Sequence, residues 1–122
     1  MKRIILLCSL ALLCVSCFTE EDFGFPKTVT FTSEGGVQDI TGDRHIGQAF
    51  IHDYKTGEDG SGGENEDGME YNELDWLKIE HQRLDDGLRI IAEPNTSGKS
   101  RKLYIELYSG QKYQVVKVVQ NR

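Results

Sequence analysis

Two alternating segments and a turn occupy residues 101–119 and read RKLYIELY (101–108), SGQK (109–112) and YQVVKVV (113–119). In the first segment Leu103, Ile105 and Leu107 fall on one face, and the β-branched run of the second segment is typical of a strand. The polar residues 109–112 close the pair as a hairpin. The stretch therefore predicts two antiparallel strands with one apolar face turned toward a core.

Segments of the same kind recur upstream of this hairpin, at residues 28–32, 37–41, 46–54, 75–81 and 88–93. In segment 46–54 we place Ile46 and Phe50 on one face. Residues 55–73 are rich in Gly, Glu, Asp and Asn, so we expect a long, mobile acidic loop there. Seven short strands without a helix predict an all-β, immunoglobulin-like β-sandwich, formed by one domain over residues 27–122.

The N-terminal residues 1–17 contain all three cysteines of the chain. A charged start, Met1 to Arg3, precedes an apolar run over residues 4–15, which is shorter than the roughly 20 residues that cross a bilayer. Ser16 then places a small residue before Cys17. This order resembles a lipoprotein signal peptide over residues 1–16 with lipidation of Cys17, and an ordinary secretory signal cut nearby is the alternative.

Lipidation of Cys17 would leave the mature chain without a free thiol, which excludes disulfides and thiol catalysis. We expect residues 17–26 to form a lipid-anchored tether. The acidic residues 20–22 in it resemble the surface-export signal of Bacteroidota lipoproteins, or they are simply a solvated linker. The expected location is the outer membrane, at the cell surface, with the periplasmic face as the alternative.

The formal net charge of the chain is −6, and removal of residues 1–16, which include Lys2 and Arg3, changes it to −8. An acidic domain without a basic stripe repels phosphate groups, so nucleic acid is excluded as a partner.

An ordered set of motifs in the C-terminal half extends the interpretation. Asp75-Trp76-Leu77 is followed by Gly87-Leu88-Arg89-Ile90, then by residues 93–98 (EPNTSG), Arg101 and the terminal strand 116–120 (VKVVQ). With residues 31–36 (FTSEGG) in front, this order resembles the BACON domain, named for Bacteroidetes-associated carbohydrate-binding, often N-terminal. The acidic stretch 55–73 departs from the family, which usually has a short connection there.

The resemblance implies an immunoglobulin-like sandwich that binds carbohydrate or mucin, or that acts as a non-catalytic structural spacer or partner-docking lipoprotein of an outer-membrane complex. It supplies no set of catalytic residues, so we expect no enzyme and no cofactor. The adjacent acids Asp85 and Asp86 fit a turn better than a glycosidase pair, whose carboxylates stand about 5–9 Å apart across a cleft.

Aromatic residues are the candidate ligand-binding residues, because their faces stack on sugar rings. Tyr104 and Tyr108 lie opposite the apolar face of their strand, which favours an exposed surface. Trp76 is a third candidate, although the family position favours the core. For metals we expect none: Asp59, Asp67 and Glu70 show offsets of a calcium loop, but Gly63 and Glu64 break its pattern, so a solvated acidic loop is the preferred interpretation and weak calcium contact the alternative.

Overall fold

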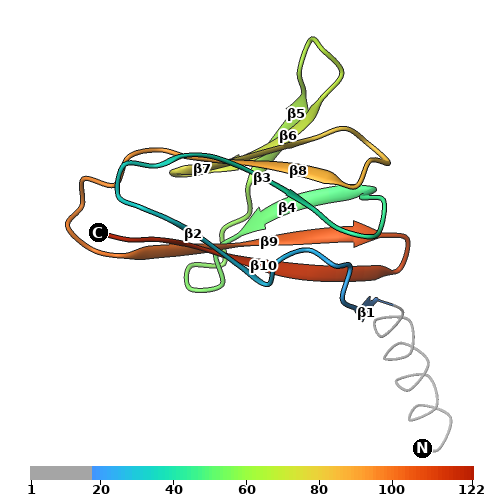
Figure 1. The fold of residues 1–122 in the computed structure, drawn as a ribbon, viewed down its shortest axis with the longest axis horizontal. Coiled ribbons are helices and arrows are strands. Elements are labelled where there is room, and N and C mark those ends of the chain that lie inside the picture. Colours follow the sequence, from blue (N-terminus) through green and yellow to red (C-terminus); the bar gives the residue numbers. More distant parts are fainter. Residues whose placement is uncertain (1–17) are drawn as a thin grey trace, which may run out of the picture.

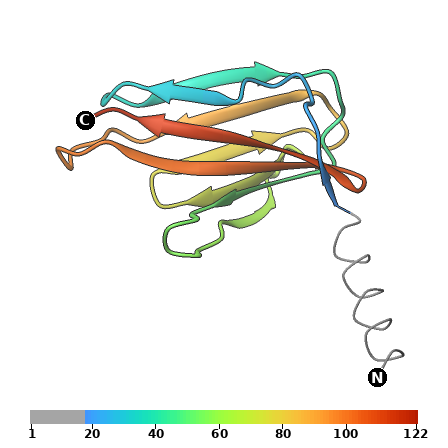
Figure 2. The same cartoon turned by 90° about the horizontal axis from the view of Figure 1, so that it is seen from below.

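The computed structural model describes residues 18–122, and it consists of two five-stranded β-sheets that pack face to face (Figures 1 and 2). Sheet A contains β1 (Thr19–Glu20), β2 (Thr28–Phe31), β4 (Gln48–His52), β9 (Arg101–Ser109) and β10 (Lys112–Gln120). Sheet B contains β3 (Gly36–Thr41), β5 (Ser61–Glu64), β6 (Glu70–Leu74), β7 (Leu77–His81) and β8 (Gly87–Ala92). None of the described residues forms a helix that is long and apolar enough to cross a membrane.

The predicted hairpin at residues 101–119 is the longest antiparallel pair, with Lys112 opposite Ser109 at one end and Gln120 opposite Arg101 at the other. Strand β4 adds to the free side of β9, and β1 and β2 both pair in parallel with β10. In sheet B the strand order is β3-β8-β7-β6-β5. The all-β sandwich class is thus as predicted.

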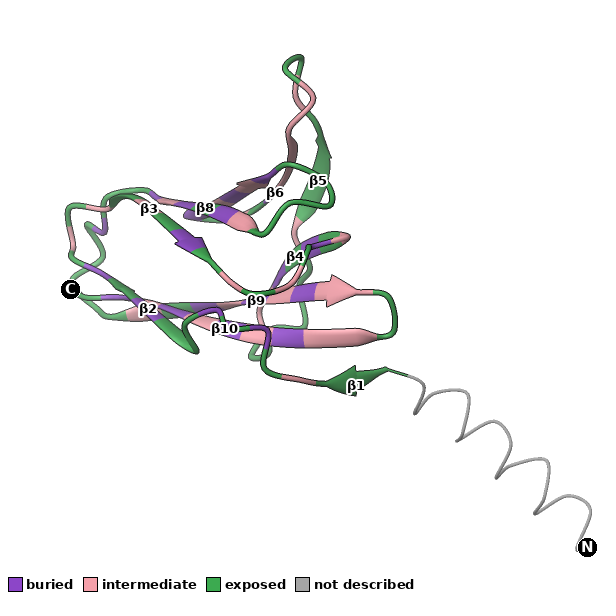
Figure 3. Cartoon of the chain, turned by 45° about the vertical axis from the view of Figure 1, so that its right-hand side comes forward, coloured by how far each residue is buried: buried purple, intermediate pink, exposed green. Residues whose placement is uncertain are grey.

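The core lies between the two sheets and uses the alternation of the strands, as the burial pattern shows (Figure 3). Sheet A contributes fully buried aliphatic side chains from β4, β9 and β10, and sheet B contributes them from β7 and β8. The central members are Ile51, Leu103, Ile105, Leu107, Val116, Val118, Leu77, Ile79, Leu88 and Ile90. Each buried side chain of this size is worth about 1.5–3 kcal/mol, so this layer dominates the stability of the fold.

The tether predicted for residues 17–26 is wrong over its described part, residues 18–26. Strand β1 already pairs with β10, and Phe23 and Phe25 are buried in the core. The buried amide of Gln114 holds this segment: its Oε1 accepts from the Phe23 backbone N–H at 2.8 Å, and its Nε2 donates to the Phe25 carbonyl at 3.0 Å. The acidic residues 20–22 stay at the surface, whereas the burial of Phe23 and Phe25 decides the packing of the segment.

The mobile loop predicted for residues 55–73 is also wrong in part, because it contains β5 and most of β6. These two strands form a hairpin whose tip projects beyond the sheets (Figure 1). The side chains of β5 are all exposed, as the composition indicates, but strand pairing needs only backbone groups. The structure therefore has ten strands where the sequence pattern predicted seven.

One buried amide ties this hairpin to the opposite sheet. Asn72 on β6 is 3% exposed, and its Oδ1 accepts from the Ile51 backbone N–H of β4 at 2.8 Å. Gly60 leads into β5 and lies so close that a Cβ there would be 2.0 Å from the Asn72 Oδ1, and its own N–H donates to the Ile51 carbonyl. A glycine is therefore needed at position 60 for this close backbone approach.

Asn72→Ala should lower the free energy of unfolding by about 1–3 kcal/mol, because it leaves the Ile51 N–H buried without an acceptor. Urea denaturation measures the loss. Glu66→Ala, at an exposed site in the same hairpin, is the matched control and should stay within about 0.5 kcal/mol of the unchanged protein. Equal, small effects for both variants would restore the mobile-loop interpretation.

Candidate functional site

The outer face of sheet A carries a patch of aromatic side chains that the strand register brings together. Residues paired across strands share a face, because side chains alternate along each strand. One row therefore joins Glu20, Tyr113, Tyr108 and Gln48, the next joins Val115, Glu106 and Phe50, and a third joins Lys117, Tyr104 and His52. The β9–β10 hairpin and two strands distant from it in the sequence, β1 and β4, thus contribute to a single surface.

The rings of this patch contact one another in two groups. In the first group the Tyr108 ring centroid lies 5.9 Å from Phe18, 6.0 Å from Phe50 and 5.7 Å from Tyr113. In the second group Tyr54 lies 4.8 Å from Tyr104 and 4.5 Å from the ring of His52. We call the two groups together, with Glu106, the aromatic patch.

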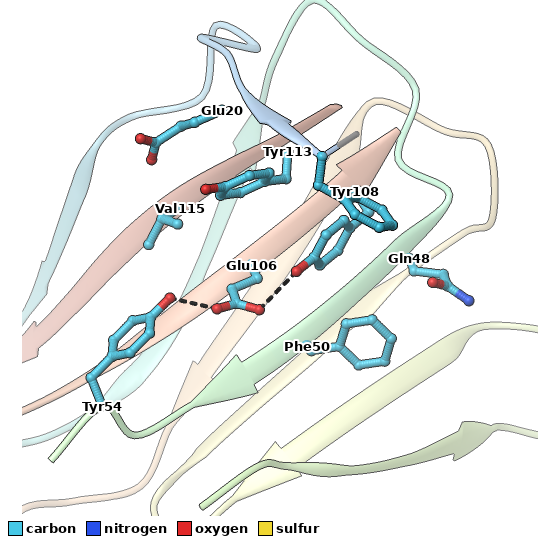
Figure 4. A pocket seen from close by; sticks show the side chains of 9 residues that line it. Glu20, Gln48, Phe50, Tyr54, Glu106, Tyr108, Tyr113 and Val115 are labelled. Atoms are coloured by element: carbon cyan, nitrogen blue, oxygen red, sulfur yellow. Dashed lines mark hydrogen bonds between the residues drawn. The ribbon is translucent and has the colours of Figure 1, made fainter. Parts of the chain in front are cut away.

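Glu106 connects the two groups, as Figure 4 shows. The Tyr54 hydroxyl donates to its Oε2 at 2.5 Å, and the Tyr108 hydroxyl donates to its Oε1 at 3.0 Å. Partial burial, reinforced by the hydrogen bond and the negative charge of Glu106, raises the pKa of Tyr108 to about 12 and raises that of Tyr54 further. Both tyrosines therefore remain protonated hydrogen-bond donors to the carboxylate near neutral pH.

An open hollow of about 630 Å³ lies over the first group and over Glu106. Its lining consists of Phe18, Glu20, Gln48, Phe50, Tyr54, Glu106, Tyr108, Tyr113 and Val115. Phe18 is 54% exposed, Phe50 39% and Tyr54 52%, so ring surface is available to a ligand. A cluster of exposed aromatics beside carboxylate and amide groups makes this hollow the candidate binding surface, and its volume falls in the range of small-molecule sites.

The predicted site residues fall into different places. Tyr108 lines the hollow, and Tyr104 lies beside it through Tyr54, both on the outer face as expected. Trp76 is only 4% exposed and belongs to the core, and the Arg101 guanidinium covers its ring at 4.7 Å. Trp76 is therefore not part of the patch, in agreement with the core placement that the family position favoured. Cys17 lies outside the described residues.

Sequence reasoning missed Phe18, Phe50 and Tyr54. Phe50 was placed on the face of Ile46, but it points outward while its neighbours Ala49 and Ile51 are buried. Phe50 and Ile51 are adjacent and both apolar, so periodicity alone allows either of them to face the core. The pairing of Phe50 with Glu106 in the sheet places Phe50 on the outer face. Phe18 could not be placed because it was assigned to the tether.

The acidic residues considered for calcium have separate partners. Asp59 contacts the His52 Nδ1 at 2.5 Å, Asp67 accepts from the Met69 N–H, and Glu70 lies 3.4 Å from the buried His81. Among residues 18–122, no group of three or more His, Cys, Asp or Glu side chains is placed to hold a metal ion.

A comparison with known families agrees with the motif order. The BACON family model, described as "Putative binding domain, N-terminal", matches residues 64–121, which include β6 to β10 in full. This stretch is thus similar to the BACON family, as its motifs predicted. Curated proteins provide no match to the chain.

Two solved structures match this chain. An NMR structure of a protein from Bacteroides thetaiotaomicron has 16% identity and a TM-score of 0.53, over 83% of this chain and 85% of that one. A Bacteroides ovatus GH5 xyloglucanase in complex with a XXXG heptasaccharide has 20% identity and a TM-score of 0.48, over 78% of this chain but 17% of the enzyme. The first of these supports the fold alone.

Tyr54 and Tyr108 should ionise in a late phase, above the ordinary pKa of a tyrosine, when the pH is raised. Phenolate absorbance measures this phase, and Tyr108→Phe should remove part of it. Because the folded-state pKa is raised, the stability these groups contribute is complete below about pH 10 and is lost as the pH rises toward 12. An unchanged late phase in Tyr108→Phe would contradict the contact of Tyr108 with Glu106.

Proposed function

We propose that this protein is a lipid-anchored surface module that binds carbohydrate through the aromatic patch, without catalysing a reaction. The observation that carries the proposal is the hollow on the outer face of sheet A, where exposed ring surface adjoins Glu106, Gln48 and Glu20. Sugar rings bind by placing their C–H faces on aromatic rings while their hydroxyl groups meet polar side chains at the rim. The described patch supplies both elements within one open surface.

The similarity of residues 64–121 to a family described as a binding domain supports the same class of function. The strands that this match covers include β9 and β10, which supply Glu106, Tyr108, Tyr113 and Val115. The remaining lining residues come from the N-terminal segment, from β4 and from the residues just after it. The matched stretch therefore supplies only part of the proposed site, and this chain completes it with its own N-terminal half.

The anchoring part of the proposal assigns the lipid to Cys17 and the protein to the outer membrane, at the cell surface. Neighbouring Cα atoms are about 3.8 Å apart, and Phe18 already packs on Tyr108. Acyl chains on Cys17 would therefore attach within one residue of the folded domain. The patch would lie close to the membrane surface, where a glycan or mucin must approach the cell to be bound.

Docking of a protein partner is the second candidate, because Phe18 and Phe50 are exposed apolar side chains in the same patch. On this alternative the domain is a structural spacer or docking subunit of an outer-membrane complex. The two candidates predict different ligands for one surface, so one set of variants separates them.

The purified domain should retain members of a glycan or mucin array with micromolar to millimolar affinity, about 4–8 kcal/mol. Tyr108→Ala should weaken retention at least about tenfold without unfolding the domain, because it removes the ring that contacts three others in the patch. Tyr71→Ala, on β6 of sheet B, is the matched control and should bind normally. A blank array, with a specific partner crosslinked in cells through the patch, would establish the docking candidate instead.

Cys17→Ala should release the protein from the membrane fraction and abolish labelling by a fatty-acid probe, because the acyl chains supply the attachment. Unchanged labelling of this variant would exclude Cys17 as the lipid acceptor. Because the domain includes residues 18–26, insertion of a flexible linker after Cys17 should preserve labelling and increase the distance between the patch and the membrane.

A further inference from the structure

We infer that the aromatic patch selects neutral glycans and rejects sulfated or carboxylated ones, and that Glu106 determines this specificity. The inference rests on the proposed carbohydrate function. It adds the class of glycan that binds and the residue that discriminates between neutral and anionic glycans. Three features of the described residues lead to it: the hydrogen-bonding groups left free in the hollow, the charges around it and the behaviour of the two tyrosines.

The first feature is the supply of hydrogen-bond donors. A tyrosine hydroxyl has one proton, and both Tyr54 and Tyr108 direct it to Glu106. Each hydroxyl can therefore only accept a hydrogen bond from a ligand. The carboxylates of Glu106 and Glu20 also only accept, so the Gln48 amide and the Tyr113 hydroxyl are the side-chain donors that remain among the residues lining the hollow.

This inventory fits sugar hydroxyl groups, each of which brings a proton to donate. Sulfate and carboxylate substituents accept hydrogen bonds but donate none when ionised. The hydroxyl groups of a neutral glycan can thus donate hydrogen bonds to the acceptors in the hollow. An anionic substituent has only acceptor atoms, so it could not form hydrogen bonds with those acceptors. Buried polar groups that lose their partners in this way are the strongest source of discrimination between similar ligands.

The second feature is the charge. Glu106 and Glu20 both line the hollow, and among the described lining residues there is no lysine or arginine. Two nearby cations, Arg44 and Lys112, are paired with Glu21 at 2.9 and 2.7 Å. Lys117 lies on the same face opposite Tyr104, but it does not line the hollow. An anionic substituent that enters the hollow therefore meets like charge from Glu106 and Glu20 without a cation among the lining residues, and the acidic domain around it adds to the repulsion.

The third feature is the raised pKa of Tyr54 and Tyr108, which shows that a negative charge is unfavourable at this site. Partial burial and Glu106 both raise the pKa of Tyr108, so a phenolate is disfavoured at the position that a ligand would contact. An anion brought in by a ligand would be subject to the same two effects. The rings and the carboxylate therefore act together as a filter against negative charge.

The test is an array that presents each oligosaccharide backbone in neutral, sulfated and uronic-acid forms. The unchanged protein should prefer the neutral form of any backbone it binds by at least about tenfold. Glu106→Gln retains the size and one acceptor oxygen but removes the charge, so it should reduce that preference by about tenfold, mainly through new binding of the anionic forms. Glu66→Gln makes the same change of charge at an exposed position in the β5–β6 hairpin and should leave the preference unchanged.

Phenolate titration gives a readout that needs no ligand: in Glu106→Gln the late tyrosine phase should move to lower pH, whereas in Glu66→Gln it should not move. Equal or stronger binding of anionic forms by the unchanged protein would overturn the inference and leave the carbohydrate function standing. A preference that survives Glu106→Gln would overturn the role of Glu106. A blank array would overturn the carbohydrate function itself, and the inference with it.

Discussion

The antiparallel pairing of β9 with β10 determines both the core and the candidate site. In this register Leu103, Ile105 and Leu107 face sheet B together with Val116 and Val118. The same alternation sends Tyr104, Glu106 and Tyr108 outward, opposite Lys117, Val115 and Tyr113. A slip of one residue would exchange the two faces, burying Glu106 and exposing the aliphatic layer, so the burial of the core is also what holds the patch in place.

Two buried amides attach the N-terminal segment and the β5–β6 hairpin to this arrangement. Gln114 binds the backbone on both sides of Gly24, and Asn72 binds the backbone of β4 from the opposite sheet. Both are nearly fully buried and hydrogen-bonded. Such groups are costly to leave unpaired, so they specify one position for the N-terminal segment and one for the β5–β6 hairpin.

On the proposed function, the N-terminal segment links anchoring to binding. Because β1 pairs with β10 and Phe18 packs on Tyr108, the candidate site incorporates the residue that follows the proposed lipid acceptor. A lipid on Cys17 would then leave the domain little freedom to orient above a membrane, because residues 18–26 already pack on the sheets. On the proposed function, the ligand would be a glycan close to the cell surface.

The sequence by itself determined seven of the strand segments of the sandwich, the motif order that resembles the BACON domain and the outward position of Tyr104 and Tyr108, and it left Trp76 open between a binding residue and the core. These features follow from alternation and motif order, which are local properties. The tertiary structure alone decided that Phe50 faces outward, that residues 18–26 and 61–74 are ordered, and that Tyr54 and Tyr108 share Glu106. Each of these features depends on pairing between strands that are far apart in the chain. The register of such pairs is the one that buries the most apolar surface while the backbone N–H and C=O groups keep their hydrogen bonds. A single segment of the sequence does not contain this information, because it lacks the partner strand.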